Sequence, residues 1–82
     1  MHYVYILKCN DEGFYIGCAS NLKKRIEQHK KGDILATDKR RPIELYCYFA
    51  FKDKYTAYNF EKYLKTGSGR AFLKRHFIAH FD

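Results

Sequence analysis

The residues best suited to chemistry are concentrated in the first thirty positions of the chain. Tyr5 and Tyr15 belong to two aromatic, β-rich segments, and Arg25 and His29 follow in a basic segment. Arg25 and His29 are four residues apart, so they occupy the same face of a helix. Phenol, guanidinium and imidazole groups together suit phosphodiester hydrolysis, which needs a base for water and a cation for the transition state.

Each of these residues also has a structural explanation. Tyrosine is common in sheets, where it packs with its hydroxyl satisfied, and an Arg–His pair on a helix is often a surface feature. A free phenol has a pKa of about 10 and is a poor base at neutral pH. We expect a neighbouring cation to favour the phenolate and so to lower a tyrosine pKa. We also expect Gly17 to leave room for a phosphate or a backbone.

Glu61 is the acidic residue with the most suggestive surroundings. Ala57, Phe60 and Leu64 place it at the inward edge of a helix that we predict over residues 54–66. A carboxylate among apolar neighbours costs free energy unless it is paired. Two explanations stay open, an ion pair with a basic residue and a metal anchor, because Mg²⁺ often takes only one or two protein carboxylates. No second inward carboxylate is evident, which argues against a two-metal nuclease site.

Composition limits the class of protein. The 82 residues leave room for one domain with a small core, which eight Tyr and seven Phe help to fill. The three cysteines form no CxxC pair, so neither a disulfide framework nor a zinc ribbon fits. We therefore expect reduced thiols and a cytoplasmic location. No apolar run is long enough for a membrane span, and no signal peptide is expected.

The formal net charge of +7 favours a polyanionic partner. A solvated basic surface is the alternative explanation, and a membrane surface is disfavoured because no long helix combines a basic face with a broad apolar one. We expect DNA as the partner, with RNA as the alternative. The candidate nucleic-acid-binding residues are drawn from three basic groups and comprise Lys23, Lys24, Lys39, Arg40 and Arg70.

The N-terminal half of the chain predicts a hairpin and a helix. Residues 3–9 are apolar on both faces, which is typical of a central strand, and residues 14–17 return as its partner after a turn. Ser20 or Asn21 can cap a helix that runs to about Lys31, with Gly32 as a stop signal.

The C-terminal half completes a ββαβαα order. Residues 33–41 are predicted to be irregular, and a third strand covers residues 43–51. A second helix over residues 54–66, capped by Asp53, is followed by a break at residues 67–69 and a short final helix. This order predicts an α+β fold, a small antiparallel sheet covered by helices.

The ordered set of motifs resembles the GIY-YIG endonuclease superfamily. Similarity is strongest to its small single-domain members, which are similar to the nuclease domain of the nucleotide-excision-repair incision protein, and residues 1–82 are expected to form one such domain. The first motif begins with Tyr3 where the family name has Gly, and the Asn that many members carry in the C-terminal portion has no equivalent after Glu61. The residues that carry the resemblance are Tyr3-Val4-Tyr5, Tyr15-Ile16-Gly17, Arg25, His29, Glu61 and the segments 60–65 and 67–74.

The resemblance implies a fold, a cofactor and an activity. The fold is an α/β sandwich with a central three-stranded antiparallel sheet, and the cofactor is one divalent metal, Mg²⁺ or Mn²⁺. Tyr5 and Tyr15 would be the motif tyrosines, Arg25 the catalytic arginine, His29 the motif histidine and Glu61 the metal ligand. The activity would be endonucleolytic hydrolysis of DNA that leaves a 5′-phosphate, with either tyrosine as the base.

Two other functions stay open at this point. A nucleic-acid-binding module without cleavage predicts salt-dependent binding and no metal-dependent product. A protein-interaction domain would use the aromatic segment at residues 46–49, although that segment is better explained as part of the sheet core. A protein partner that controls or directs a weak nuclease is also compatible with so small a chain, and the sequence leaves the oligomeric state open.

Overall fold

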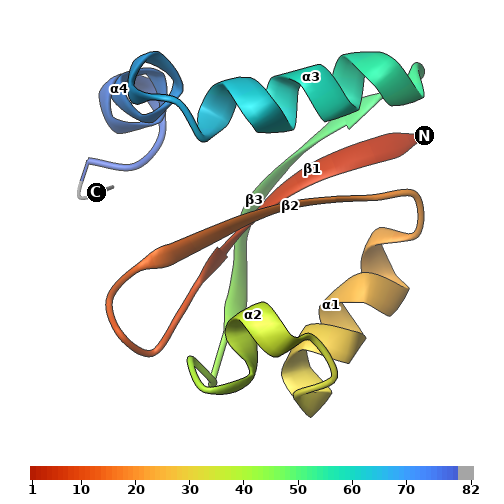
Figure 1. The fold of residues 1–82 in the computed structure, drawn as a ribbon, viewed down its shortest axis with the longest axis vertical. Helices are drawn as coiled ribbons and strands as arrows, with labels where there is room; N and C mark the ends of the chain where they lie inside the picture. The colour runs from red at the N-terminus through yellow and green to blue at the C-terminus, as the bar shows by residue number, and fades with distance from the viewer. Residues whose placement is uncertain (80–82) are drawn as a thin grey trace.

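A three-stranded antiparallel sheet, with strand order β2-β1-β3, lies at the centre of the molecule (Figure 1). The computed structural model describes residues 1–79. The strands are β1 (His2–Lys8), β2 (Phe14–Ala19) and β3 (Glu44–Phe51). β1 is the central strand, and its residues Val4 to Leu7 are fully buried, as its two apolar faces require.

Helices cover both faces of this sheet. One face carries α1 (Leu22–Lys31) and the one-turn helix α2 (Leu35–Asp38), and the other carries α3 (Lys54–Leu64) and α4 (Gly67–His76) (Figure 1). The α+β fold with a three-stranded antiparallel sheet is therefore confirmed. The observed order is ββααβαα, which differs from the predicted ββαβαα by the added helix α2.

Capping residues set the ends of the longer helices. The Asn21 side chain accepts a hydrogen bond of 3.1 Å from Lys24 N at the start of α1, and Gly32, at a φ of 86°, ends that helix. Asp53 caps α3 by accepting a 2.8 Å bond from Thr56 N. These boundaries agree with the capping pattern of the sequence.

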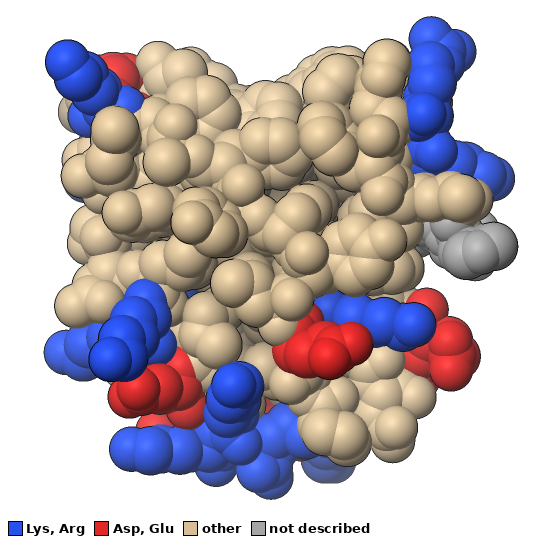
Figure 2. Space-filling view, turned by 180° about the vertical axis from the view of Figure 1, so that it is seen from behind, with Lys and Arg blue, Asp and Glu red and all other residues tan. Residues whose placement is uncertain are grey.

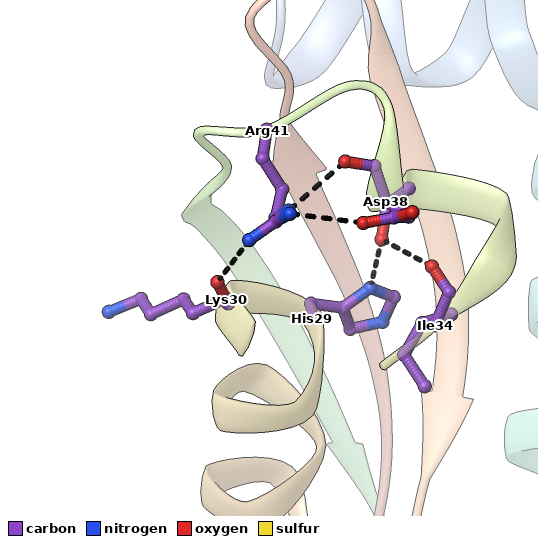
Figure 3. Close-up of polar contacts among 6 residues, drawn as sticks. His29, Lys30, Ile34, Asp38 and Arg41 are labelled. Carbon is purple, nitrogen blue, oxygen red and sulfur yellow. Dashed lines mark hydrogen bonds and ion pairs between the residues drawn. The ribbon is translucent and has the colours of Figure 1, made fainter. Parts of the chain in front are cut away.

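The segment between α1 and β3 was predicted to be irregular, and this prediction was wrong. Thr37 N and Asp38 N both donate to Ile34 O, at 3.1 and 3.0 Å, and form the turn of α2. The Arg41 guanidinium then joins α2 to α1 by donating to Asp38 O, Asp38 Oδ1 and Lys30 O (Figure 3). These contacts with the end of α1 stabilise α2, a single turn that is too short to show a helical repeat of apolar residues in the sequence.

The boundary between the last two helices also differs from the prediction. Gly67, predicted as part of the break, is the first residue of α4, and the helix before it ends at Leu64. Thr66 is the N-cap, and its Oγ1 accepts a 3.1 Å bond from Gly69 N. A Cβ at Gly69 would overlap the backbone of Tyr63, so glycine allows α3 and α4 to meet closely at this corner.

Two apolar clusters fill the space on the two sides of the sheet. The cluster under α3 and α4 comprises Val4, Ile6, Ile16, Ala57, Leu64, Leu73 and Ile78. The cluster under α1 comprises Tyr5, Leu7, Cys9, Ile26 and Ile43. Alternation along β1 thus turns Tyr5 toward the helix that carries Arg25 and His29.

The three cysteines are free thiols, with Cys9 buried and Cys18 and Cys47 partly buried. Within residues 1–79, no helix combines the length and the apolar character that crossing a bilayer requires.

Candidate active site at the edge strand β2

The Tyr5 side chain crosses the edge strand β2 at Gly17. These two residues are cross-strand partners in the β1–β2 pairing. A Cβ at Gly17 would overlap the ring and hydroxyl of Tyr5, so the missing side chain makes space for the phenol. We had expected Gly17 to make room for a phosphate or a backbone, but the space is taken by the Tyr5 ring.

A buried chain of hydrogen bonds runs from Tyr5 through His29 to α2. The Tyr5 hydroxyl lies 2.8 Å from His29 Nε2, and His29 Nδ1 lies 2.7 Å from Thr37 Oγ1. The Thr37 hydroxyl donates to Ile34 O at 3.5 Å (Figure 3). Because that carbonyl only accepts, Thr37 Oγ1 accepts from His29 Nδ1–H, and Nε2 is left to accept from the Tyr5 hydroxyl.

Burial keeps both ring groups neutral at pH 7. Desolvation raises the pKa of Tyr5 to about 12, and the opposing hydrogen bond from Arg25 is too weak to prevent this. Desolvation, with a smaller contribution from the Arg25 charge, lowers the pKa of His29. The expectation that a neighbouring cation would lower the tyrosine pKa was therefore wrong for Tyr5, because the loss of water outweighs the effect of the cation.

Tyr15 and Arg25 complete the group on the α1 side of the sheet. The Tyr15 ring centroid lies 5.2 Å from that of His29 and 6.4 Å from that of Tyr5. The hydrogen bond and the charge of Arg25 both act to lower the pKa of the Tyr5 hydroxyl, against the larger effect of burial. The buried Nε of Arg25 nevertheless has no hydrogen-bond partner among residues 1–79. A buried donor without an acceptor is rare in proteins, and no acidic side chain among the described residues neutralises this guanidinium through its Nε.

A polar hollow of about 460 Å³ opens beside Arg25. It lies where β2 ends and α1 begins, so it adjoins the point at which Tyr5 crosses the strand. Its lining residues are Cys18, Ala19, Ser20, Asn21, Lys24, Arg25 and Gln28. This hollow gives the Tyr5–Arg25 group an adjoining space that could accept a ligand.

Glu61 approaches the same strand from the other face of the sheet. Its helix, α3, lies opposite α1, but the carboxylate contributes to the raised pKa of the Tyr5 hydroxyl and of the Cys18 thiol, after the larger effect of burial in both cases. The Glu61 side chain is 14% exposed, and Lys65 Nζ lies 3.0 Å from its Oε2. Both explanations that the sequence left open thus remain, since the carboxylate is ion-paired with Lys65 and its charge also acts on the Tyr5 hydroxyl.

A metal at this position would have one protein carboxylate to bind. No group of three or more His, Cys, Asp or Glu side chains within residues 1–79 is arranged to hold a metal ion. A single carboxylate supplemented by water and substrate oxygens fits Mg²⁺ or Mn²⁺, which are hard cations that retain water ligands. It does not fit Zn²⁺, which takes three or four protein ligands.

The predicted nucleic-acid-binding residues do not all lie together. Lys24 lines the hollow, and Lys23 is exposed beside it on α1. Arg40 instead makes a bidentate ion pair with Asp11 of the β1–β2 turn, with Nε 2.6 Å from Oδ2, at the other end of the hairpin. Lys39 is exposed next to Arg40, and Arg70 is exposed on α4, across the sheet from α1.

Thr37 is the one residue of the hydrogen-bonded chain that the sequence did not suggest. It is fully buried in α2, and its hydroxyl fixes the tautomer of His29. Its only signal in the sequence is a hydroxyl residue among Ile, Leu and Ala at the centre of a charged segment. Nothing in that pattern indicates that the hydroxyl reaches an imidazole on the preceding helix.

Comparison with known proteins assigns this fold to a family of nuclease-type domains. A sequence profile described as the GIY-YIG catalytic domain matches residues 1–75. The chain belongs to the GIY-YIG family.

Relatives of this chain are small bacterial proteins. The UPF0213 protein CPE1444 of Clostridium perfringens is 44% identical over 66 residues, which cover 79% of this chain and 71% of that protein. The UPF0213 protein SSP2268 of Staphylococcus saprophyticus is 39% identical, over 89% of this chain and 90% of that one. The solution structure of the UPF0213 protein BH0048 of Bacillus halodurans is similar in fold, with a TM-score of 0.60 and 30% identity, over 96% of this chain and 87% of that one.

Gly17→Ala should displace the Tyr5 ring and break its bond to His29, because the new methyl group occupies the position of the phenol. We expect a loss of about 1–3 kcal/mol in the free energy of unfolding, measured by urea denaturation, and altered NMR signals of the His29 ring. Gly67→Ala is the control, since a Cβ there meets no atom within 4 Å. Equal stability of the two variants, with an unchanged His29 ring, would contradict this role of Gly17.

The stability of the protein should fall as the pH drops from about 7.5 to 5.5. The lowered pKa of His29 means that the unfolded chain takes up a proton that the folded chain does not, so unfolding is favoured below the ordinary histidine pKa. Urea denaturation across this pH range should show that the free energy of unfolding falls less in His29→Gln than in the unmodified protein. His76→Gln, at an exposed position, should show the same fall in the free energy of unfolding as the unmodified protein. An equal fall in all three proteins would show that His29 does not cause the pH dependence.

Proposed function

We propose that this protein is a metal-dependent endonuclease that hydrolyses phosphodiester bonds in DNA. The observation that best supports the proposal is the hydrogen-bonded Tyr5–His29 pair beside an arginine whose buried Nε has no partner among residues 1–79. Arg25 lines the hollow, and a phosphate oxygen is an acceptor of the right charge for its guanidinium. The hollow beside Arg25 provides the space for it.

Tyr5 and His29 together form a route for the proton of the attacking water. A phenol with a pKa of about 12 holds its proton too firmly to be present as the phenolate at pH 7. The Tyr5 oxygen instead takes the water proton while its own proton passes to the neutral His29 Nε2, 2.8 Å away. The water oxygen forms its bond to phosphorus, the bond to the 3′-oxygen breaks, and the cleaved strand keeps a 5′-phosphate.

Arg25 and Thr37 support the two ends of this route. Arg25 donates to the phosphate oxygens and stabilises the negative charge that develops on them in the transition state. Thr37 accepts from His29 Nδ1–H, which orients the imidazole and stabilises the positive charge that it gains. Tyr15 packs against the His29 ring and limits its movement.

Glu61 is the residue that would hold the divalent metal. When bound, the metal would act as a Lewis acid for the phosphate and the leaving oxygen. The carboxylate belongs to α3, and its charge acts on both the Tyr5 hydroxyl and the Cys18 thiol of β2, so it is the acidic group that would serve a metal at this strand. Lys65 has to release Oε2 if that oxygen is to bind a cation.

The Lys65–Glu61 ion pair also favours a second candidate function, a nucleic-acid-binding module that does not cleave. An ammonium group that neutralises the carboxylate leaves a basic surface without a metal site. This alternative predicts salt-dependent binding of DNA and no product in the presence of Mg²⁺ or Mn²⁺.

Incubation with supercoiled plasmid separates the two candidates. We expect nicking with Mg²⁺ or Mn²⁺ and none with a chelator. Arg25→Ala and Glu61→Gln should each reduce the rate about 100-fold or more, because each removes a charge from the reacting phosphate or from its metal. The far-UV CD spectra should remain unchanged, and Glu27→Gln, at an exposed position on α1, is the matched control. Full nicking by either site variant would contradict the mechanism.

Lys65→Met should make metal binding easier, because it removes the cation that competes for Glu61 Oε2. An exposed ion pair contributes about 0.2–1 kcal/mol, so the metal concentration for half-maximal nicking should fall up to about fivefold. Electron paramagnetic resonance of Mn²⁺ measures the same affinity without cleavage. Lys62→Met, on the same helix, is the control, and an unchanged or higher Mn²⁺ midpoint in Lys65→Met would show that Lys65 does not compete with the metal.

A further inference from the structure

A second hollow lies against the first one at the end of β2. It measures about 280 Å³, and it is lined by Cys18, Ala19 and Ser20 together with His2 and Lys54. The residues Cys18, Ala19 and Ser20 also line the hollow beside Arg25. The two spaces therefore share this short stretch of β2 as a common wall, and we call the two hollows together the strand-end groove.

Sheet topology brings the start of the chain and the starts of two helices to this groove. β2 and β3 are both antiparallel to β1, so both end beside the N-terminus of β1, with Ala19 opposite Tyr3 and Phe51 opposite His2. The helices that follow these strands, α1 and α3, therefore begin at the same end of the sheet but on opposite faces (Figure 1). The groove passes between these two helix starts.

The charges around the strand-end groove are mostly positive. Lys24 and Arg25 lie on the α1 side, and Lys54 lies on the α3 side with His2 next to it. The first turn of α1 contains no acidic residue and its N-cap, Asn21, is neutral, so the positive end of that helix dipole is uncompensated at the groove. Asp53 is the acidic residue at this end: hydrogen bonds from the backbone N and the hydroxyl of Thr56, with a smaller effect of His2, lower the pKa of its carboxylate, which caps the start of α3.

The opposite side of the molecule has a different character. Its centre lacks Lys, Arg, Asp and Glu, and the charged residues gather at its rim (Figure 2). The other edge strand, β3, exposes Leu45, Tyr46 and Tyr48 rather than basic residues. A polyanion therefore gains more from the β2 end of the sheet than from the β3 edge.

We infer that a nucleic-acid phosphate backbone follows the strand-end groove from Arg25 past Ser20 to Lys54. Lys54 and His2 are then phosphate-contacting residues on the far side of β2 from the catalytic group. Each phosphate is held by N–H and O–H donors, which Lys54, the His2 ring and the Ser20 hydroxyl can provide. The inference rests on the proposed action on nucleic acid, but it concerns binding and requires no cleavage.

The test measures binding of fluorescein-labelled DNA by fluorescence anisotropy, with a chelator present to prevent cleavage. Single-stranded and duplex probes are titrated separately over a range of salt concentrations. Lys54→Ala should weaken binding of the favoured probe several-fold and reduce the salt slope by about 0.9 on duplex or about 0.7 on a single strand. Lys54→Glu should weaken it further. Lys74→Ala removes the same charge from α4, away from the groove, and should retain both the affinity and the slope.

Each outcome separates this inference from the proposed nuclease activity. A loss of DNA affinity that is confined to the Lys54 variants supports binding along the strand-end groove, whether or not plasmid is nicked with metal. Equal effects of Lys54→Ala and Lys74→Ala would show that only the net charge matters and would overturn the groove. Nicking with unaltered DNA binding in both Lys54 variants would overturn the groove and leave the nuclease intact.

Discussion

The structure depends on the burial of one phenol and one imidazole that satisfy each other. Tyr5 and His29 both have no exposed surface, and each would leave an unpaired polar group in the core without the other. Their bond also joins the central strand to α1, and the Thr37 hydroxyl extends it to α2. A hydrogen-bonded chain of three residues therefore fixes two helices to one face of the sheet and orders the site at the same time.

The same burial decides how the site can work. Removing water from Tyr5 and His29 stabilises their neutral forms, so neither a phenolate nor an imidazolium is available beforehand. A proton can still move between them, because the donor and acceptor atoms are already in contact. In the proposed mechanism, the charge needed at the phosphate comes from Arg25, whose buried Nε is not paired with any acid among the described residues. The core thus provides the proton route, and the strand edge provides the charge.

Spacing and residue type predict the parts of this arrangement that depend on local structure. The four-residue interval of Arg25 and His29, the caps at Asn21 and Asp53 and the doubly apolar β1 all follow from local patterns. The parts that depend on tertiary contact do not follow. Thr37 bonds to a ring eight residues earlier, and the Tyr5 pKa rises mainly because the fold buries its hydroxyl away from water. Arg40 carries the same charge as Lys24, and only the fold assigns it to Asp11.

The proposed mechanism needs groups from both faces of the sheet at one ligand, and the narrow sheet is what would allow this. α1 and α3 lie on opposite sides of the sheet, and in its interior a side chain from one could not reach the other. β2 is an edge strand of six residues, and at Gly17 it has no side chain, so the Tyr5 hydroxyl and the Glu61 carboxylate come within electrostatic range of each other there. A substituent at Gly17 would close that approach, and a further strand beyond β2 would cover it. The catalytic group proposed here therefore requires β2 to remain an uncovered edge, which also leaves its end open as a groove for a polyanion.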